Sequence, residues 1–212
     1  MAKKSAGLLL HREASDRIEL FLVHPGGPFW ARKDEGAWSI PKGEFEEGED
    51  PLEAAKREFC EETGVAVTGE FQPLAPLKQP SGKILYAWMV KGNVDAAGLK
   101  SNTFSIEWPR GSGGVQEFPE VDQGEWFDLA LAKRKILRGQ LPFLEQLEAR
   151  VTTAKPGQAE DRKASSSATS PAQRRKHKLP CSTSKWRAAP GSQDLWSLHF
   201  LIVHASHASS RG

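Results

Sequence analysis

Sulfur-containing residues, tyrosine and long apolar stretches are scarce in this chain of 212 residues. It contains two cysteines, two methionines and one tyrosine. Two cysteines provide no disulfide framework of the kind that holds small secreted domains together. The apolar run at residues 195–203 is far shorter than the ~20 residues that a membrane-spanning helix needs. There is no glycine-rich P-loop or dinucleotide-binding fingerprint either. We therefore expect a cytoplasmic protein without membrane contact.

Charge divides the chain near residue 151. Residues 1–150 hold 19 basic and 24 acidic residues, a net charge of −5, whereas residues 151–212 hold 10 and 3, a net charge of +7. The second part lacks hydrophobic periodicity, so burial cannot offset the entropy of ordering it. We predict one domain over residues 1–150 and a basic, disordered tail over 151–212. The basic cluster at residues 174–178 is either a nucleic-acid contact or only solvated.

Apolar periodicity predicts the other elements of the domain. Strands are expected at residues 5–10, 18–23, 65–74, 83–90 and 124–129, and helices at residues 130–137 and 141–150. Between these segments lies the most informative stretch, residues 43–65, with the sequence GEFEEGEDPLEAAKREFCEETGV. Asp50 is a good N-cap, Pro51 suits the first helical position, and Gly64 is a typical stop. The stretch therefore predicts a loop at residues 43–49 followed by a helix from Pro51 to Thr63.

Three carboxylates gather on one side of this predicted helix. At ~100° per residue, Glu58, Glu61 and Glu62 fall within an arc of about 100°. Like charges at this spacing repel each other, which favours a cation between them. Carboxylate oxygens suit a hard ion such as Mg²⁺ or Mn²⁺, and no histidine or cysteine cluster competes for a softer metal. The simpler interpretation is a solvated acidic face, but such a face needs no preceding loop.

The same stretch resembles the box of the Nudix hydrolases. The matching positions are Gly43, Glu49, Arg57, Glu58, Glu61, Glu62 and Gly64, with apolar residues at Phe59 and Val65. The resemblance implies an α/β/α sandwich with a mixed sheet and cleavage of a pyrophosphate linkage in a nucleotide. It also implies that Glu58, Glu61 and Glu62 bind the metal together with the Gly43 carbonyl. Arg57 would orient the glutamates, with Glu49 as its partner.

Residues outside the box are weaker candidates. Lys42 is well placed to contact a phosphate, or is a surface lysine beside an acidic loop. Trp30 could stack on a base or cap the core, and Tyr86 could line a substrate pocket or lie on a half-buried strand. Glu117 and Glu120 occur in a segment that reads as a loop, where an acid could act as the base or remain solvated. We expect Glu120 to assist catalysis.

Together these features predict a metal-dependent pyrophosphohydrolase acting on a nucleoside triphosphate or a dinucleoside polyphosphate. A catalytically silent nucleotide sensor, whose basic tail contacts nucleic acid, is the alternative. The identity of the catalytic base and the oligomeric state stay open.

Overall fold

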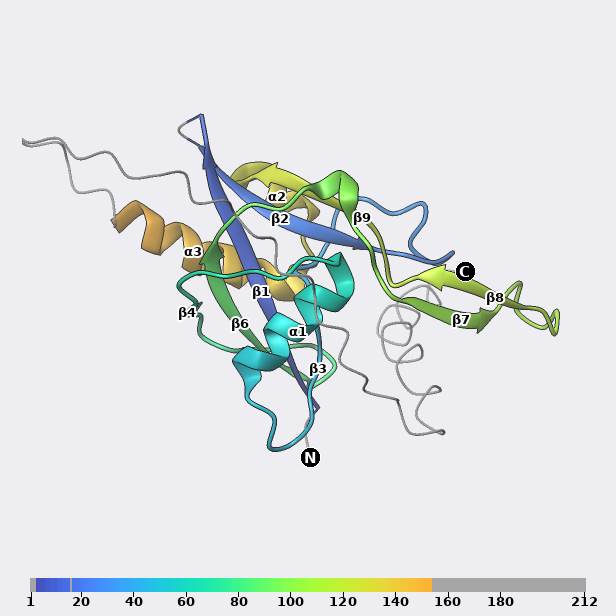
Figure 1. Ribbon diagram of the computed structural model, residues 1–212. Coiled ribbons are helices and arrows are strands. Elements are labelled where there is room, and N and C mark those ends of the chain that lie inside the picture. The colour runs from blue at the N-terminus through green and yellow to red at the C-terminus, as the bar shows by residue number, and fades with distance from the viewer. Residues whose placement is uncertain (1–2, 16, 154–212) are drawn as a thin grey trace, which may run out of the picture.

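A mixed β-sheet forms the centre of the computed structural model, which describes residues 3–15 and 17–153 (Figure 1). Nine strands are described: β1 (Lys4–Ala14), β2 (Arg17–Pro25), β3 (Lys42–Glu44), β4 (Gln72–Pro73), β5 (Leu77–Lys78), β6 (Ile84–Lys91), β7 (Thr103–Glu107), β8 (Val115–Pro119) and β9 (Val121–Asp128). The α-helices are α1 (Pro51–Thr63), α2 (Leu129–Lys135) and α3 (Leu141–Thr153), and 3₁₀ turns lie at Ala96–Gly98 and Arg138–Gln140.

The main sheet has the strand order β4-β6-β1-β2-β9 within the described residues, with β3 paired to β1 and β5 to β6. Strands β1 and β6 run parallel, whereas β1 is antiparallel to both β2 and β3. Strands β7 and β8 form a separate two-stranded hairpin. This arrangement confirms the predicted mixed sheet.

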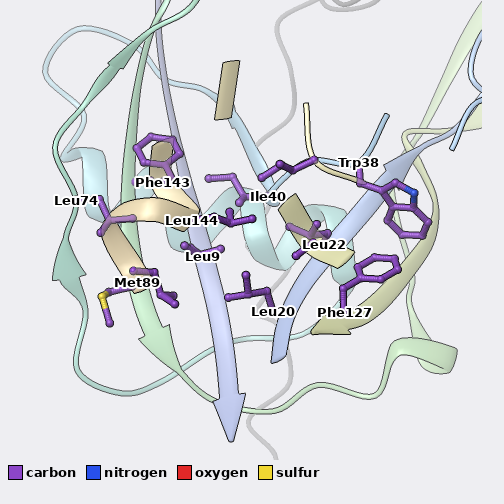
Figure 2. Packing of buried hydrophobic residues seen from close by; sticks show 14 of the residues in the cluster. Leu9, Leu20, Leu22, Trp38, Ile40, Leu74, Met89, Phe127, Phe143 and Leu144 are labelled. Atoms are coloured by element: carbon purple, nitrogen blue, oxygen red, sulfur yellow. The ribbon is translucent and has the colours of Figure 1, made fainter. Parts of the chain in front are cut away.

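Alternating side chains of the two central strands supply a core on each face of the sheet. Leu9 and Leu22 pack toward α2 and α3, while Leu8 and Phe21 pack toward α1. Figure 2 shows the first of these cores, where Phe143 and other fully buried side chains lie against the strands. Complete burial of such a side chain contributes roughly 1.5–3 kcal/mol. Helices therefore cover both faces of the sheet, as the predicted α/β/α sandwich requires (Figure 1).

Two segments differ from the expected elements. The strand predicted over residues 65–74 is wrong, because only Gln72–Pro73 pairs with β6. Val65 and Val67 are half-buried against the core on the α1 side of the sheet, but no described strand pairs with them. The alternation of apolar and polar residues there reflects side-chain packing rather than β-sheet hydrogen bonding. The segment before the last predicted strand, read as a loop, contains β8 and the start of β9.

The predicted boundary at residue 150 falls within α3, which continues to Thr153. The predicted tail, including the basic cluster at 174–178, otherwise lies outside the described residues, and the division into domain and tail stays a prediction. No helix in residues 3–15 and 17–153 is long and apolar enough to cross a membrane.

The buried imidazole of His11 makes the stability of the folded protein depend on pH. Its side chain is 7% exposed, and its Nδ1 is the only buried side-chain N or O atom without a hydrogen bond in the described part of the chain. Burial, reinforced by Lys91, lowers the pKa of His11 below its ordinary value of 6.5. The unfolded chain therefore binds the proton first as pH falls, so stability is lost below about pH 6.5.

We expect thermal melts of His11→Leu to lose less stability between pH 7 and pH 5 than melts of the wild type. Lys91→Gln should reduce the same loss only in part, because it removes the nearby cation but leaves the imidazole buried. Parallel pH profiles of wild type and His11→Leu would contradict this assignment.

Candidate functional site

Helix α1 has the caps that its sequence predicts. The Asp50 carboxylate accepts hydrogen bonds from the amides of Leu52 and Glu53, both at 3.0 Å. Gly64 adopts a left-handed conformation with φ 74°, and its amide donates to the Cys60 carbonyl at 2.7 Å. These local contacts set where the helix begins and ends, and therefore which direction its glutamates face.

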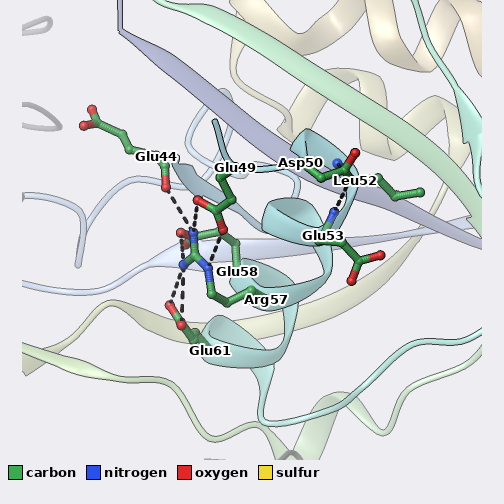
Figure 3. A network of polar contacts seen from close by, with 8 residues as sticks. All are labelled: Glu44, Glu49, Asp50, Leu52, Glu53, Arg57, Glu58 and Glu61. Carbon is green, nitrogen blue, oxygen red and sulfur yellow. Dashed lines mark hydrogen bonds and ion pairs between the residues drawn. The ribbon is translucent and has the colours of Figure 1, made fainter. Parts of the chain in front are cut away.

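Arg57 lies at the centre of an acidic network on this helix (Figure 3). Its guanidinium donates to Glu58 at 2.6 Å and to Glu49 at 3.1 Å, and lies 3.4 Å from Glu61. Partial burial lowers the pKa of Arg57, but the carboxylates of Glu58 and Glu49 raise it overall. The arginine stays charged and holds the loop before α1 against the helix.

Glu58 is packed against the backbone of β3. A Cβ atom on Gly43 would lie 1.8 Å from Glu58 Oε2, so only glycine allows this approach. Glu58 is 7% exposed. Burial raises its pKa to about 7, against the opposing effect of Arg57. The position of the Glu58 carboxylate therefore depends on the backbone of β3 at Gly43, and the reverse also holds.

Glu62 faces the same region from the last turn of α1. Its Oε2 accepts a hydrogen bond from the Lys42 amide at 3.0 Å. Burial raises the pKa of Glu62, partly offset by Lys42, and burial lowers the pKa of the Lys42 amine. The contact links the start of β3 to the acidic side of the helix.

These groups open onto a cavity of about 180 Å³. Its charged lining residues, with Gly43 between them, are Lys42, Gly43, Glu44, Glu58, Glu62, Lys83 and Glu120. Its largely apolar lining residues are Val23, Pro25, Gly26, Phe29, Trp30, Phe104 and Val121. The cavity therefore offers groups suited to metal and phosphate together with groups suited to a planar apolar moiety.

The two candidate loop acids separate clearly. Glu120 has an exposed side chain, but it lies between β8 and β9 and lines the cavity, where partial desolvation, and then Glu61, raise its pKa. Glu117 lies on β8, is exposed, and contacts the Thr103 hydroxyl. The hairpin thus brings only Glu120 to the site.

The remaining predicted residues also divide. Lys42 and Trp30 line the cavity, whereas Tyr86 packs edge-on against Phe45 at 5.9 Å and is not among the described lining residues. Sequence reasoning missed Lys83 and Phe104. Phe104 belongs to β7, a strand that was not predicted, and no local signal marks Lys83 as a cavity residue.

Of the three carboxylates predicted to bind metal, Glu61 is the one outside the cavity lining, with a side chain 42% exposed. Among residues 3–15 and 17–153, no three histidine, cysteine or acidic side chains are grouped closely enough to hold a metal ion. Arg57 and the Lys42 amide instead satisfy Glu58 and Glu62.

Comparison with known proteins identifies the family. The sequence model of the NUDIX domain matches residues 1–147. The chain therefore belongs to the NUDIX family, which confirms the predicted resemblance.

Two curated relatives are RNA pyrophosphohydrolases. That of Helicobacter pylori (strain G27) is 38% identical over 74 residues, which are 32% of this chain and 46% of the relative. The RNA pyrophosphohydrolase of Roseobacter denitrificans is 32% identical over 102 residues, which are 44% of this chain and 61% of the relative. The chain thus spans about half the length of these relatives.

A solved structure supports the fold. The NUDIX domain of Shewanella oneidensis NrtR, complexed with ADP ribose, superposes with a TM-score of 0.51 at 17% identity. The match covers 71% of this chain and 89% of the NrtR domain. At this identity the likeness concerns the fold alone.

Proposed function

We propose that this protein is a divalent-metal-dependent pyrophosphohydrolase that cleaves a phosphoanhydride in a nucleoside triphosphate or a dinucleoside polyphosphate. The observation that carries the proposal is the mixed lining of the cavity. Four carboxylates and two lysines line it together with Phe29, Trp30 and Phe104. Membership of the NUDIX family supports the same chemistry.

The carboxylates that line the cavity suit Mg²⁺ or Mn²⁺. They offer oxygen ligands, which hard cations prefer. Burial of Glu58 and Glu62 close to each other is costly, and a cation would relieve that cost. Glu58, Glu61, Glu62 and the Gly43 carbonyl would hold the ion. A bound divalent cation would neutralise phosphate oxygens and lower the pKa of an attacking water.

The chain's own residues would perform the remaining steps. Arg57, anchored by Glu49, orients Glu58 and Glu61. Lys42 would contact a phosphate as a point charge. The water oxygen forms a bond to phosphorus as the bridging P–O bond breaks, and the water's proton passes to a cavity glutamate. Glu120 is the candidate outside the helix, because the hairpin brings its carboxylate to the same cavity.

The aromatic lining residues indicate which side chains would contact the nucleoside. Trp30 is 7% exposed, and Lys33 Nζ lies 4.4 Å from the centroid of its ring. Phe29 packs edge-on against Trp108 at 5.2 Å. We expect Phe29 and Phe104 to contact the base from the loop and hairpin sides, since aromatic stacking tolerates every base.

A cytoplasmic location remains a prediction.

A substrate panel tests this function on the full chain. The panel contains nucleoside triphosphates, a dinucleoside tetraphosphate, ADP-ribose and a 5′-triphosphorylated RNA, each assayed for phosphate or pyrophosphate release. We expect release from a triphosphate or the dinucleoside substrate with Mg²⁺ or Mn²⁺, loss of release in EDTA, and recovery when the metal is restored.

Two outcomes would contradict the proposal. Release that persists in EDTA would exclude dependence on an exchangeable divalent metal. No release from any substrate would favour the silent nucleotide sensor, an alternative that the presence of all the box glutamates argues against.

A further inference from the structure

A buried histidine joins three segments at the edge of the cavity. His24, near the end of β2, is 5% exposed and packs edge-on against Trp38 at 5.3 Å. Its Nδ1 lies 2.7 Å from Asp122 Oδ1, and its Nε2 lies 2.9 Å from the Lys33 carbonyl oxygen. The ring therefore links β2 to β9 and to the loop that follows β2.

The contact with the Lys33 carbonyl gives the ring a defined orientation. A carbonyl oxygen can only accept a hydrogen bond, so Nε2 donates to it. Nδ1 then faces the carboxyl group of Asp122. The two contacts lie on opposite sides of one buried ring, and moving the ring would disturb both.

The contact with Asp122 coincides with an irregularity in the sheet. His24 pairs with Gln123 and Pro25 pairs with Val121, so Asp122 is the extra residue of a bulge on β9. A bulge of this kind redirects a side chain, and here the redirected carboxylate reaches His24.

Glu120 is tied to the same place. Its carbonyl accepts from the Gly26 amide at 2.9 Å, and its own amide donates to Asn102 at 2.8 Å. Two residues farther along, Asp122 is fixed by the ring of His24. The backbone of Glu120 is therefore held by Gly26 and Asn102, and His24 holds Asp122 two residues farther along.

The second contact anchors the loop that carries aromatic lining residues. The Lys33 carbonyl belongs to the loop that carries Phe29 and Trp30, and the Lys33 amide donates to the Trp30 carbonyl at 2.7 Å. A single ring therefore connects segments that carry acidic and aromatic lining residues of one cavity.

We propose that His24 is a positioning residue, holding Glu120 through Asp122 and the Trp30 loop through the Lys33 carbonyl. The catalytic part of this inference rests on the proposed function. Loss of either contact would release one of the two segments that the ring joins.

Other charges near the ring come from the loop and from α2. Asp34 accepts from the Trp38 indole at 2.9 Å and pairs with Lys135 of α2, and its carboxylate interacts electrostatically with His24. The Lys33 amine is drawn over the Trp30 ring. Asp122 and Asp34 are thus the acids that face His24.

NMR of the ¹⁵N-labelled full chain tests the two contacts without relying on activity. We expect the Nε2 proton of His24 to exchange slowly with water in the wild type, because the buried ring donates it to the Lys33 carbonyl. In Asp122→Asn the resonance of Nδ1 should move, because its partner changes, while the Nε2 proton stays protected. An Nε2 proton that exchanges freely with water in the wild type would overturn the proposed contacts, even if no substrate were hydrolysed.

Kinetics on the best substrate of the panel test the positioning. We expect Asp122→Ala to lower kcat about 10-fold with KM changed less than about 2-fold, because the Lys33 contact remains. His24→Ala should lower kcat and also raise KM. Glu125→Ala, at an exposed acid of the same strand, is the matched control. Wild-type kcat in a folded Asp122→Ala protein would overturn the positioning role, whereas an inactive wild type would contradict the proposed function instead.

Discussion

Replacing Glu62 by glutamine should lower kcat by at least ~100-fold while the fold survives. In the wild type, Glu62 Oε2 accepts a hydrogen bond from the Lys42 amide at 3.0 Å. The glutamine side-chain oxygen can still accept this hydrogen bond, so the contact with the backbone is retained. What is lost is the negative charge facing the cavity, which would bind metal or take a proton. We expect the same loss for Glu61→Gln. Turnover of each variant, together with its melting temperature, measures the effect.

Glu53→Gln is the matched control for these variants. Glu53 lies in the first turn of the same helix, where its exposed carboxylate pairs with Lys56 at 2.7 Å. An exposed pair of this kind is worth little, so activity should stay close to wild type. Wild-type rates in both Glu61→Gln and Glu62→Gln would overturn the site assignment.

The second large effect is expected at Gly43. An added Cβ would lie 1.8 Å from Glu58 Oε2 and 2.0 Å from its carboxyl carbon, a separation that atoms cannot adopt. Gly43→Ala must therefore displace Glu58 or the β3 backbone. A misplacement of about 1 Å in a catalytic group can cost ~100-fold in rate, and we expect a loss of that size.

Gly114→Ala shows whether such a loss is specific to the site. Gly114 lies in the hairpin loop, where the nearest atom to an added Cβ would be Ser112 Oγ at 3.5 Å, an ordinary contact. Its activity should be near wild type. If Gly43→Ala retained full kcat, the close approach of Glu58 to β3 would be irrelevant to function.

Helix α1 shows what local signals can predict. Its ends agree with the prediction because an N-cap carboxylate and a left-handed C-terminal glycine act within a few residues of the chain. The arc of carboxylates follows from the helical repeat alone. Strand prediction succeeded where burial alternates along a paired strand, as in β6, and failed over residues 65–74, where the alternation has no paired neighbour.

The family, the acidic helix and the residue types that suit a metal and a phosphate could all be predicted from the sequence. Which of these residues share a cavity depends on how distant segments pack. Glu117 and Glu120 are three residues apart and chemically equal, but pairing within the hairpin places Glu117 beside the Thr103 hydroxyl, whereas Glu120 lines the cavity. The link from His24 to Asp122 spans 98 residues and depends on a strand bulge. Such contacts arise from the pairing of distant strands, which no local pattern specifies.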